Sequence, residues 1–195
     1  PLGIERDGYY QIFTGAQNEN VYTNDWVGPF WGFKKVIQTF KLTDKPRRLK
    51  PIDIYYHIYS GSKRASLNAL HDIYQWAIKQ DVMPIYTSAY PAKVLDFYSA
   101  SMMKDNDTWI IKGLDALKNI RMPKQWFIDI EQSKGVVGYK QYNDSRYVHL
   151  DGEGEYQLLT SKSEIESNYL LDANAALVKY DKTQGGVNLH LKGHV

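Results

Sequence analysis

The chain has 195 residues, of which 43% are apolar and 24% are charged, and its formal net charge is +2. This near-neutral balance argues against a nucleic-acid backbone as partner, and the absence of cysteine excludes disulfide frameworks and thiolate metal sites. No run of about 18 apolar residues is present, so the sequence predicts no membrane span.

The N-terminal part predicts a short strand and a long polar loop over residues 8–26, followed by a helix. Asparagine-rich loops are typical of turns, although this one could also line a site. The Gly28-Pro29 pair places proline at a helix start, and Asp44-Lys45-Pro46 ends the helix. Its apolar stripe at helical spacing consists of Phe30, Phe33, Ile37 and Phe40.

The strand predicted over residues 51–61 is the segment around which the chain is organised. Successive strand side chains point to opposite faces. One face carries Ile52, Ile54, Tyr56 and Ile58, which suits packing beneath helices. The other face carries Asp53, Tyr55, His57 and Tyr59. Ligand sites of parallel α/β sheets and barrels lie at the carboxyl ends of the strands, so His57 is the first candidate for chemistry.

Two further helices and one further strand follow in alternation. A helix is predicted over residues 63–80, with Leu67, Leu70, Ile73 or Tyr74, Ala77 and Ile78 on its buried face. A strand at 82–87 then leads into a third helix capped by Ser88. This order is typical of parallel βα units. Two strands are too few for a stable parallel sheet, so we expect the remaining strands to lie elsewhere.

After a polar break at 104–107 the helical spacing gives way to short alternating runs, which predict an antiparallel β-sandwich. The fold class is therefore α/β followed by all-β, with domains at 1–103 and 104–195. The absence of an initiator Met and the alternation that continues to Val195 lead us to expect a piece of a longer protein. The predicted strands lie at 108–112, 117–122, 136–139, 147–150, 156–159, 169–171, 176–180 and 187–192.

No complete catalytic motif is visible, and the candidate chemistry rests on His57. Histidine has an ordinary pKa suited to proton transfer near neutral pH. Tyr55 and Tyr59 flank it on the same face and could bracket a bound ring. The alternative is a structural, hydrogen-bonded histidine. The 16 tyrosines of the chain fit either a sugar-stacking surface or the rim of a β-rich core.

The other titratable groups favour structural interpretations. His71 follows the apolar stripe of its helix and is interpreted as a boundary residue. His149 and His190 alternate with apolar neighbours on predicted strands, which indicates that both face solvent. The acidic residues Asp151, Glu153 and Glu155 alternate with glycines and predict a turn rather than a cation loop.

Five segments of the first hundred residues resemble the Pel exopolysaccharide deacetylase family. The run around His57 is the most specific, and the resemblance covers residues 8–100 strongly and the β module weakly. The segments are Asn18-Glu-Asn-Val-Tyr-Thr-Asn24, Gly28-Pro-Phe-Trp-Gly32, Arg47-Arg-Leu-Lys-Pro51, Ile54-Tyr-Tyr-His-Ile-Tyr-Ser-Gly-Ser-Lys63 and Met83-Pro-Ile-Tyr-Thr-Ser88.

The resemblance implies the last strands and helices of a (β/α) deacetylase barrel that acts on an amino-sugar exopolysaccharide of the biofilm matrix, in the periplasm or outside the cell. It implies a divalent metal, most simply zinc, in the full-length protein, and His57 as the acid that protonates the leaving amine. It also suggests Trp26 and Trp31 as substrate-facing aromatics. The Thr-Phe-Asp-Asp and His-x-x-x-His motifs do not occur here, so we expect this chain alone to hold no metal and to be inactive.

Two non-catalytic alternatives remain open from the sequence. The β module could bind carbohydrate through surface tyrosines, or it could dock onto other proteins of an exopolysaccharide export system.

Overall fold

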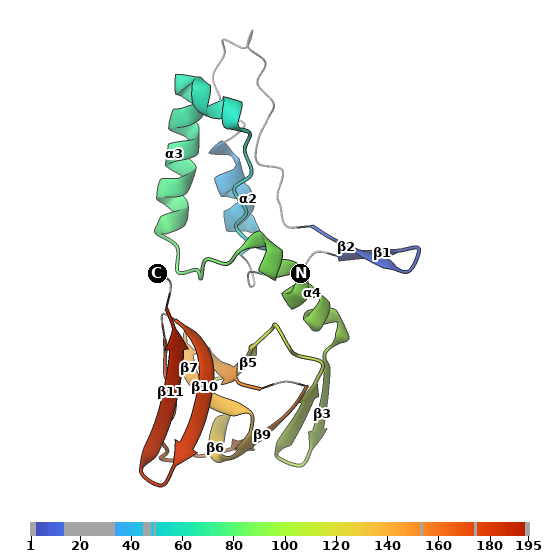
Figure 1. Ribbon diagram of the computed structural model, residues 1–195, viewed down its shortest axis with the longest axis vertical. Coiled ribbons are helices and arrows are strands. Elements are labelled where there is room, and N and C mark those ends of the chain that lie inside the picture. Colours follow the sequence, from blue (N-terminus) through green and yellow to red (C-terminus); the bar gives the residue numbers. More distant parts are fainter. Residues whose placement is uncertain are drawn as a thin grey trace. The chain divides into compact units, whose positions relative to one another are not determined.

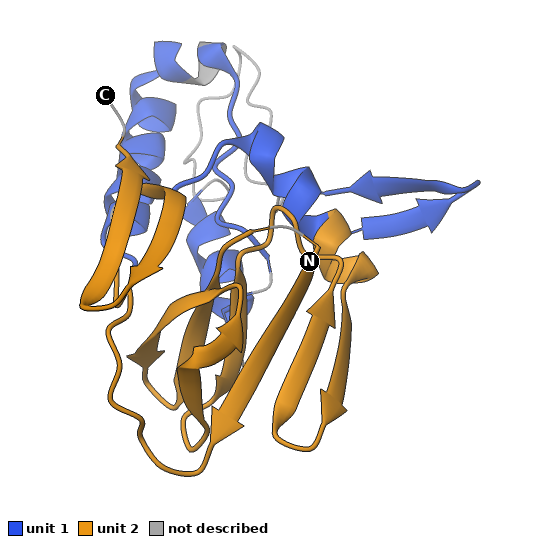
Figure 2. Ribbon diagram, turned by 60° about the horizontal axis from the view of Figure 1, so that its bottom comes forward, with its two compact units in different colours: residues 1–94 blue, residues 95–195 orange. Residues whose placement is uncertain are grey.

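The computed structural model describes residues 3–13, 34–44, 48, 50–152, 154–173 and 175–193, except for the side chains at 59 and 60. These residues form two compact units, residues 1–94 (unit 1) and residues 95–195 (unit 2) (Figure 2). Helices are few, and every strand pair in the described ranges is antiparallel.

Unit 1 begins with a β-hairpin of β1 (Gly3–Arg6) and β2 (Tyr9–Ile12) (Figure 1). The two turn residues, Asp7 and Gly8, have φ of 54° and 77°. A two-residue turn with positive φ at both positions matches the right-handed twist of the flanking strands, which is why Asp-Gly is favoured there.

The core of unit 1 lies between two helices, α2 (Val36–Leu42) and α3 (Arg64–Ile78). The rings of Phe40 and Trp76 stack with their centroids 5.7 Å apart. An ion pair between Lys34 and Asp72 joins the two helices at 2.5 Å. The residues buried between the helices are Val36, Phe40, Ala69, Leu70 and Ile73.

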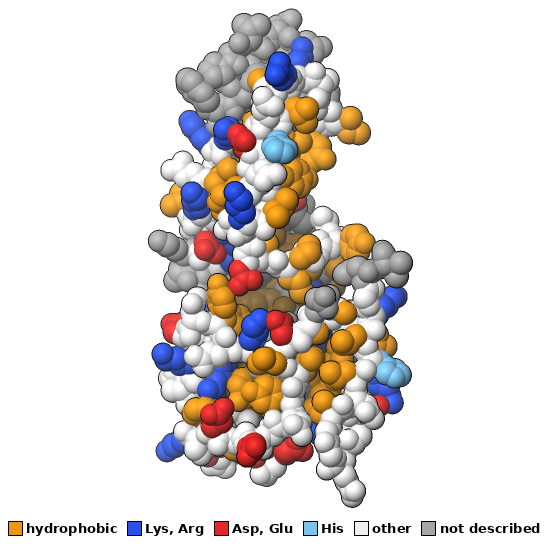
Figure 3. Space-filling view, turned by 90° about the vertical axis from the view of Figure 1, so that its left-hand side faces the viewer, with side chains coloured by type: hydrophobic (Ala, Val, Ile, Leu, Met, Phe, Trp, Pro, Cys, Tyr) orange, Lys and Arg blue, Asp and Glu red, His pale blue; other side chains and the backbone are white. Residues whose placement is uncertain are grey.

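The stripe predicted on α3 is only partly buried. Leu70 and Ile73 are in the core, whereas Leu67, Tyr74 and Ile78 are exposed, Ile78 by 75%. Among the described residues, α2 and the segment with Ile52 and Ile54 cover one face of α3, and the rest of its apolar stripe is left exposed. Figure 3 looks onto this side of unit 1 and shows the apolar side chains gathered there.

The two strands predicted in unit 1 do not form. Residues 51–57 and 82–86 belong to no strand, and residues 58–62 form the 3-10 helix η1 (Ile58–Ser62). Their ends are extended, with φ and ψ of −95° and 149° at His57 and −68° and 141° at Tyr86. Extended backbone becomes a sheet only when a neighbour supplies hydrogen-bond partners, and among the described residues neither segment is paired with a strand. Ile58, expected on the helix side, is 93% exposed.

A second 3-10 helix, η2 (Thr87–Ala89), leads from residues 82–86 into α4 (Tyr90–Ser99). Ser88, which was predicted to cap α4, lies inside η2, and α4 begins at Tyr90. As the sequence predicts, Pro91 is in its first turn, where a missing N–H leaves no helical bond unmade. The helix begins in unit 1 and ends in unit 2.

Unit 2 contains two sheets and a separate hairpin (Figure 1). One sheet has the order β3-β4-β9-β6, the other the order β5-β8-β7, and β10 pairs with β11. The strands are β3 (Ser101–Asp105), β4 (Thr108–Lys112), β5 (Asn119–Pro123), β6 (Phe127–Lys134), β7 (Val136–Tyr142), β8 (Ser145–Leu150), β9 (Glu155–Ser161), β10 (Ala176–Thr183) and β11 (Gly186–Lys192).

Most strands of unit 2 lie where alternation predicts them, with three differences. The polar break at 104–107 is the tight turn of the β3–β4 hairpin, with Asn106 at φ 51°, so β3 lies before it. Strand β6 was not predicted. Residues 169–171 form no strand; instead the Leu170 amide donates to the Val137 carbonyl at 2.9 Å, and the segment runs along β7 as a strap.

Both sheets of unit 2 contribute to one hydrophobic core. Side chains alternate along each strand, so the inward set interdigitates while the outward set meets water. The buried residues are Ile111, Leu114, Ile120, Met122, Ile128, Ile130, Val136, Tyr139, Val148, Leu150, Tyr156 and Leu158.

A carboxylate fastens the end of α4 to the loop before β5. One oxygen of Asp96 accepts hydrogen bonds from the backbone amides of Asp115, Ala116 and Leu117 at 2.8, 2.6 and 2.7 Å. Burial by itself would raise the pKa of Asp96, but the three amide donors outweigh it and lower that pKa.

Candidate functional site

The segment that carries His57 keeps the alternation expected from its sequence over residues 52–57. Ile52 and Ile54 pack against the α2–α3 core, and the ring of Tyr56 meets Tyr74 of α3 edge to face, with centroids 6.4 Å apart. Tyr55 and His57 occupy the alternate positions and pair with each other.

Tyr55 and His57 form a hydrogen-bonded pair. The Tyr55 hydroxyl lies 3.0 Å from His57 Nε2, and the rings meet edge to face at 5.1 Å with an interplanar angle of 79°. Tyr55 is 54% exposed and His57 is half-buried. An imidazole held by a phenol and still open to solvent can give or take a proton from a bound molecule.

The other residues expected beside His57 are not seen there. Trp26 and Trp31 lie outside the described residues, as does the side chain of Tyr59. Asp53, on the same face by alternation, lines a pocket that neither Tyr55 nor His57 borders.

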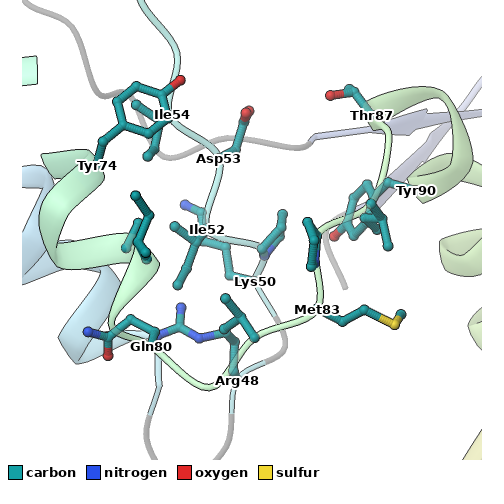
Figure 4. Close-up of a pocket in the computed structure, with 16 residues that line it drawn as sticks. Arg48, Lys50, Ile52, Asp53, Ile54, Tyr74, Gln80, Met83, Thr87 and Tyr90 are labelled. Atoms are coloured by element: carbon teal, nitrogen blue, oxygen red, sulfur yellow. The ribbon is translucent and has the colours of Figure 1, made fainter. Parts of the chain in front are cut away.

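This pocket is an open cavity of about 690 Å³ in unit 1 (Figure 4). Its walls are the C-terminal half of α3 and the two extended segments, with Tyr90 of α4. The lining is mostly apolar, and Arg48, Lys50 and Asp53 are its charged members. The full set is Arg48, Lys50, Pro51, Ile52, Asp53, Ile54, Tyr74, Ala77, Ile78, Gln80, Val82, Met83, Pro84, Ile85, Thr87 and Tyr90.

Two groups that line the pocket are influenced by their neighbours, Arg48 through hydrogen bonding and ion pairing and Tyr74 through burial. Arg48 donates to the Phe40 carbonyl at 2.8 Å and pairs with Asp44 at 3.2 Å, which ties the pocket to the end of α2. Burial, and after it the neighbouring Tyr56 and Asp53, raise the pKa of Tyr74. Sequence reasoning missed this pocket, because apolar residues of α3 such as Ile78 were assigned to a closed core.

The remaining histidines differ in exposure. His190 on β11 is exposed, as predicted, and His71 on α3, which was interpreted as a boundary residue, is exposed as well. His149 is half-buried, which corrects the prediction that it faces solvent, because Leu171 of the strap and the adjacent Asp172 lie close to its ring. Its Nδ1 lies 2.6 Å from Asn119 Oδ1, and burial lowers its pKa.

Where a turn was predicted over the acidic run at 151–155, Gly152 and Gly154 are bends with φ of 91° and 82°, and Glu155 is the first residue of β9. Glu155 pairs with Lys112 at 2.8 Å, and Glu153 lies outside the described residues. In the parts of the chain that the structure describes, no three His, Asp or Glu side chains come together to hold a metal ion. In the same parts, no helix has the length and apolar character that crossing a membrane requires.

Comparison with protein-family models, with curated proteins and with solved structures found no match. The interpretation of this chain therefore rests on its own residues and on the motif resemblance around His57.

Proposed function

We propose that this chain is the C-terminal part of a polysaccharide N-deacetylase that acts on an amino-sugar exopolysaccharide. In this proposal unit 1 supplies the last strands and helices of a (β/α) barrel, and unit 2 is an antiparallel β-sandwich. The substrate class places the protein in the periplasm or outside the cell. The observation that carries the proposal is the hydrogen-bonded pair of Tyr55 and His57, which lies within the segment that resembles the deacetylase family.

The order of elements in unit 1 supports the barrel. Two extended segments, 51–57 and 82–86, each run into a 3-10 turn and then a helix, which is the order of a βα unit. His57 is the last residue before η1, and therefore lies at the carboxyl end of its segment, where barrel enzymes place chemistry. Strands from elsewhere in the barrel would supply the backbone partners that both segments need.

His57 would act as the general acid. Deacetylation adds water across the amide: the C–N bond breaks, the acyl group leaves as acetate, and the departing nitrogen takes a proton. A protonated His57 would supply that proton and become neutral. The Tyr55 hydroxyl at 3.0 Å would hold the ring in position through the cycle.

A deacetylase of this family also uses a divalent metal, and the described residues do not suit one, because no cluster of three potential ligands is found among them. The role assigned to this chain is therefore limited to proton donation and to positioning of the ring.

The test is the rate of deacetylation of an N-acetylated oligosaccharide by the complete polypeptide that contains this chain. His57→Ala is expected to lower kcat on the order of 100-fold or more, since positioned acids contribute about 10²–10⁴-fold. Tyr55→Phe, which keeps the ring and removes the hydroxyl, should lower it less. His71→Ala, an exposed histidine of the same unit, is the matched control. An unchanged rate in His57→Ala would refute the role of His57.

A second candidate is a non-catalytic module that binds carbohydrate or docks onto exopolysaccharide export proteins. Unit 2 favours it, because its core is complete without unit 1. Co-precipitation of the complete polypeptide with the polymer, or with export proteins, distinguishes the two partners. If the complete polypeptide binds one of these partners and shows no deacetylation, the non-catalytic function is supported.

A further inference from the structure

A lysine lies between two tryptophans on unit 2. The ammonium of Lys104 is 4.2 Å from the ring centroid of Trp126 and 5.6 Å from that of Trp109. The two indole rings are 6.2 Å apart and tilted by 52°, so they form a wedge. We call Lys104, Trp109 and Trp126 the indole clamp.

The two rings are fixed, whereas the lysine is not. Trp109 is on β4 and both indoles pack against the core of unit 2. The backbone of Trp126 is held in two places: its amide donates to Pro123 at 3.2 Å, and its carbonyl accepts from Arg146 at 2.8 Å. Both rings are half-buried, which leaves part of each accessible.

Lys104 is on β3, an edge strand of its sheet, and lies opposite Trp109 on the neighbouring strand β4. It is paired with Trp109 in the β3–β4 register, and β3 has a strand neighbour on one side only. All five residues of β3 are exposed. A long exposed side chain on an edge strand changes rotamer freely, so its contact with the rings is readily exchanged for another.

We propose that the indole clamp binds a sugar unit that bears a free ammonium group, and that Lys104 occupies the position of that group until the sugar displaces it. The choice of an amino sugar rests on the proposed function, because removal of an acetyl group from the polymer produces this cation. The clamp then recognises the product of the reaction rather than its substrate.

The physical basis is the attraction between a cation and the face of an indole. Such contacts contribute about 0.5–1 kcal/mol at exposed sites and about 2 kcal/mol when water is excluded. An ammonium group fits against both rings at once, because the ammonium of Lys104 already contacts both. A pyranose ring adds an apolar C–H face that can stack on an accessible part of an indole face. An acetylated nitrogen carries no charge, so it loses the cation contact.

The experiment is a titration of the full 195-residue chain, followed by the indole N–H signals of Trp109 and Trp126 in two-dimensional NMR. The probes are a glucosamine oligomer, the matching N-acetylglucosamine oligomer and a lysine-containing peptide. Lys104→Met keeps the aliphatic stem and removes the competing charge. Lys162→Met, an exposed lysine after β9, is the control.

We expect the glucosamine oligomer to shift both indole signals and to bind Lys104→Met about 2- to 5-fold more tightly than the native chain, the equivalent of one exposed cation–π contact. Lys162→Met should bind as the native chain does. Trp126→Phe, which keeps a ring with a weaker attraction for cations, should bind less tightly in the Lys104→Met background.

Several results would overturn the proposal. No shift at either indole in Lys104→Met excludes a site in the clamp. Equal shifts with the N-acetylated oligomer show that charge is not recognised, and stronger binding of the lysine peptide assigns the clamp to a protein partner. Equal affinity of native chain and Lys104→Met shows that Lys104 does not compete. Because binding is measured without turnover, failure here leaves the test of His57 intact, and the reverse also holds.

Discussion

The two units of this chain differ in how many of their extended segments are paired in sheets and in how many of their apolar side chains are buried. In unit 2, neighbouring strands pair along most of their length and twelve buried residues form one core. In the described part of unit 1, five buried residues lie between two helices, and the extended segments 51–57 and 82–86 pair with no strand. Large apolar side chains such as Met83 (72%) and Tyr86 (76%) are exposed there.

The comparison shows how the spacing of extended segments along the chain affects the outcome. Antiparallel strands that follow one another along the chain supply each other's hydrogen-bond partners locally, so unit 2 closes its sheets with its own residues. The extended segments 51–57 and 82–86 of unit 1 are separated by α3 rather than by a tight turn, and unit 1 presents a pocket and exposed apolar side chains there. We therefore expect unit 2 to carry most of the chain's own stability.

The largest expected effect comes from truncating a side chain in the core of unit 2. Leu158 is fully buried, and Leu158→Ala should lower the free energy of unfolding of unit 2 by about 3 kcal/mol through lost burial and the cavity left behind. Ile78 in unit 1 is 75% exposed, so Ile78→Ala should change the free energy of unfolding of unit 1 by less than about 0.5 kcal/mol. Hydrogen exchange of the β4 amides measures the first effect. Equal effects of the two variants would contradict the contrast between the units.

The next effect concerns the strap on β7. A Cβ added at Gly138 would overlap the backbone carbonyl of Leu170, so Gly138→Ala must push the strap away. We expect the free energy of unfolding to fall by about 2–3 kcal/mol and the Tyr139–Tyr169 ring stack to be lost. Near-UV circular dichroism measures the loss of the stack. Gly185→Ala is the control, because an added Cβ there meets nothing within 4 Å. An unchanged ring signal in Gly138→Ala would mean that the strap is not packed as described.

The Asp96 anchor should have a smaller, pH-dependent effect. Its pKa is lowered on folding, so its stabilisation is present above the ordinary carboxyl pKa and is lost as pH falls through the lowered value. At neutral pH, Asp96→Asn should destabilise unit 2 by about 1–2 kcal/mol, since bonds to a charged acceptor are replaced by weaker ones. Urea unfolding at several pH values measures the difference, which should shrink towards acidic pH. Asp107→Asn, an exposed carboxylate, serves as control; a difference independent of pH would refute the anchor.

The smallest effect at neutral pH is expected for Tyr139→Phe, below about 1 kcal/mol. Burial, followed by a hydrogen bond with Tyr169, raises the pKa of Tyr139 to about 12. A raised pKa stabilises the folded state below the ordinary value near 10, and this stabilisation is lost as pH rises from about 10 to about 12. Between these pH values, the unfolding temperature of the native chain should fall more steeply with pH than that of Tyr139→Phe. Tyr142→Phe, half-exposed on the same strand, should decline as the native chain does.

Local patterns predicted much of what was observed. Alternation located β4 at Thr108–Lys112 and placed Ile52 and Ile54 towards the helices, and helix signals located α3 and α4 to within a few residues. Strand β6 was missed because the alternation of its two isoleucines with Asp129 and Glu131 is short and breaks off at Gln132, after which the run to Lys134 is polar. Its pairing with β9 also shifts register after Asp129, which hides the period.

The sequence by itself determined much of the local conformation: the helices α3 and α4, and the extended run that carries Tyr55 and His57 and leads into a turn. The end of that run was predicted near residue 61, whereas η1 already begins at Ile58. These local conformations depend on neighbours a few residues apart. Only the tertiary structure decided which extended segments become sheet, that the strap half-buries His149, and that Lys104 lies between two indoles. Those outcomes depend on backbone partners and side chains brought together from distant positions, and local periodicity carries no information about them.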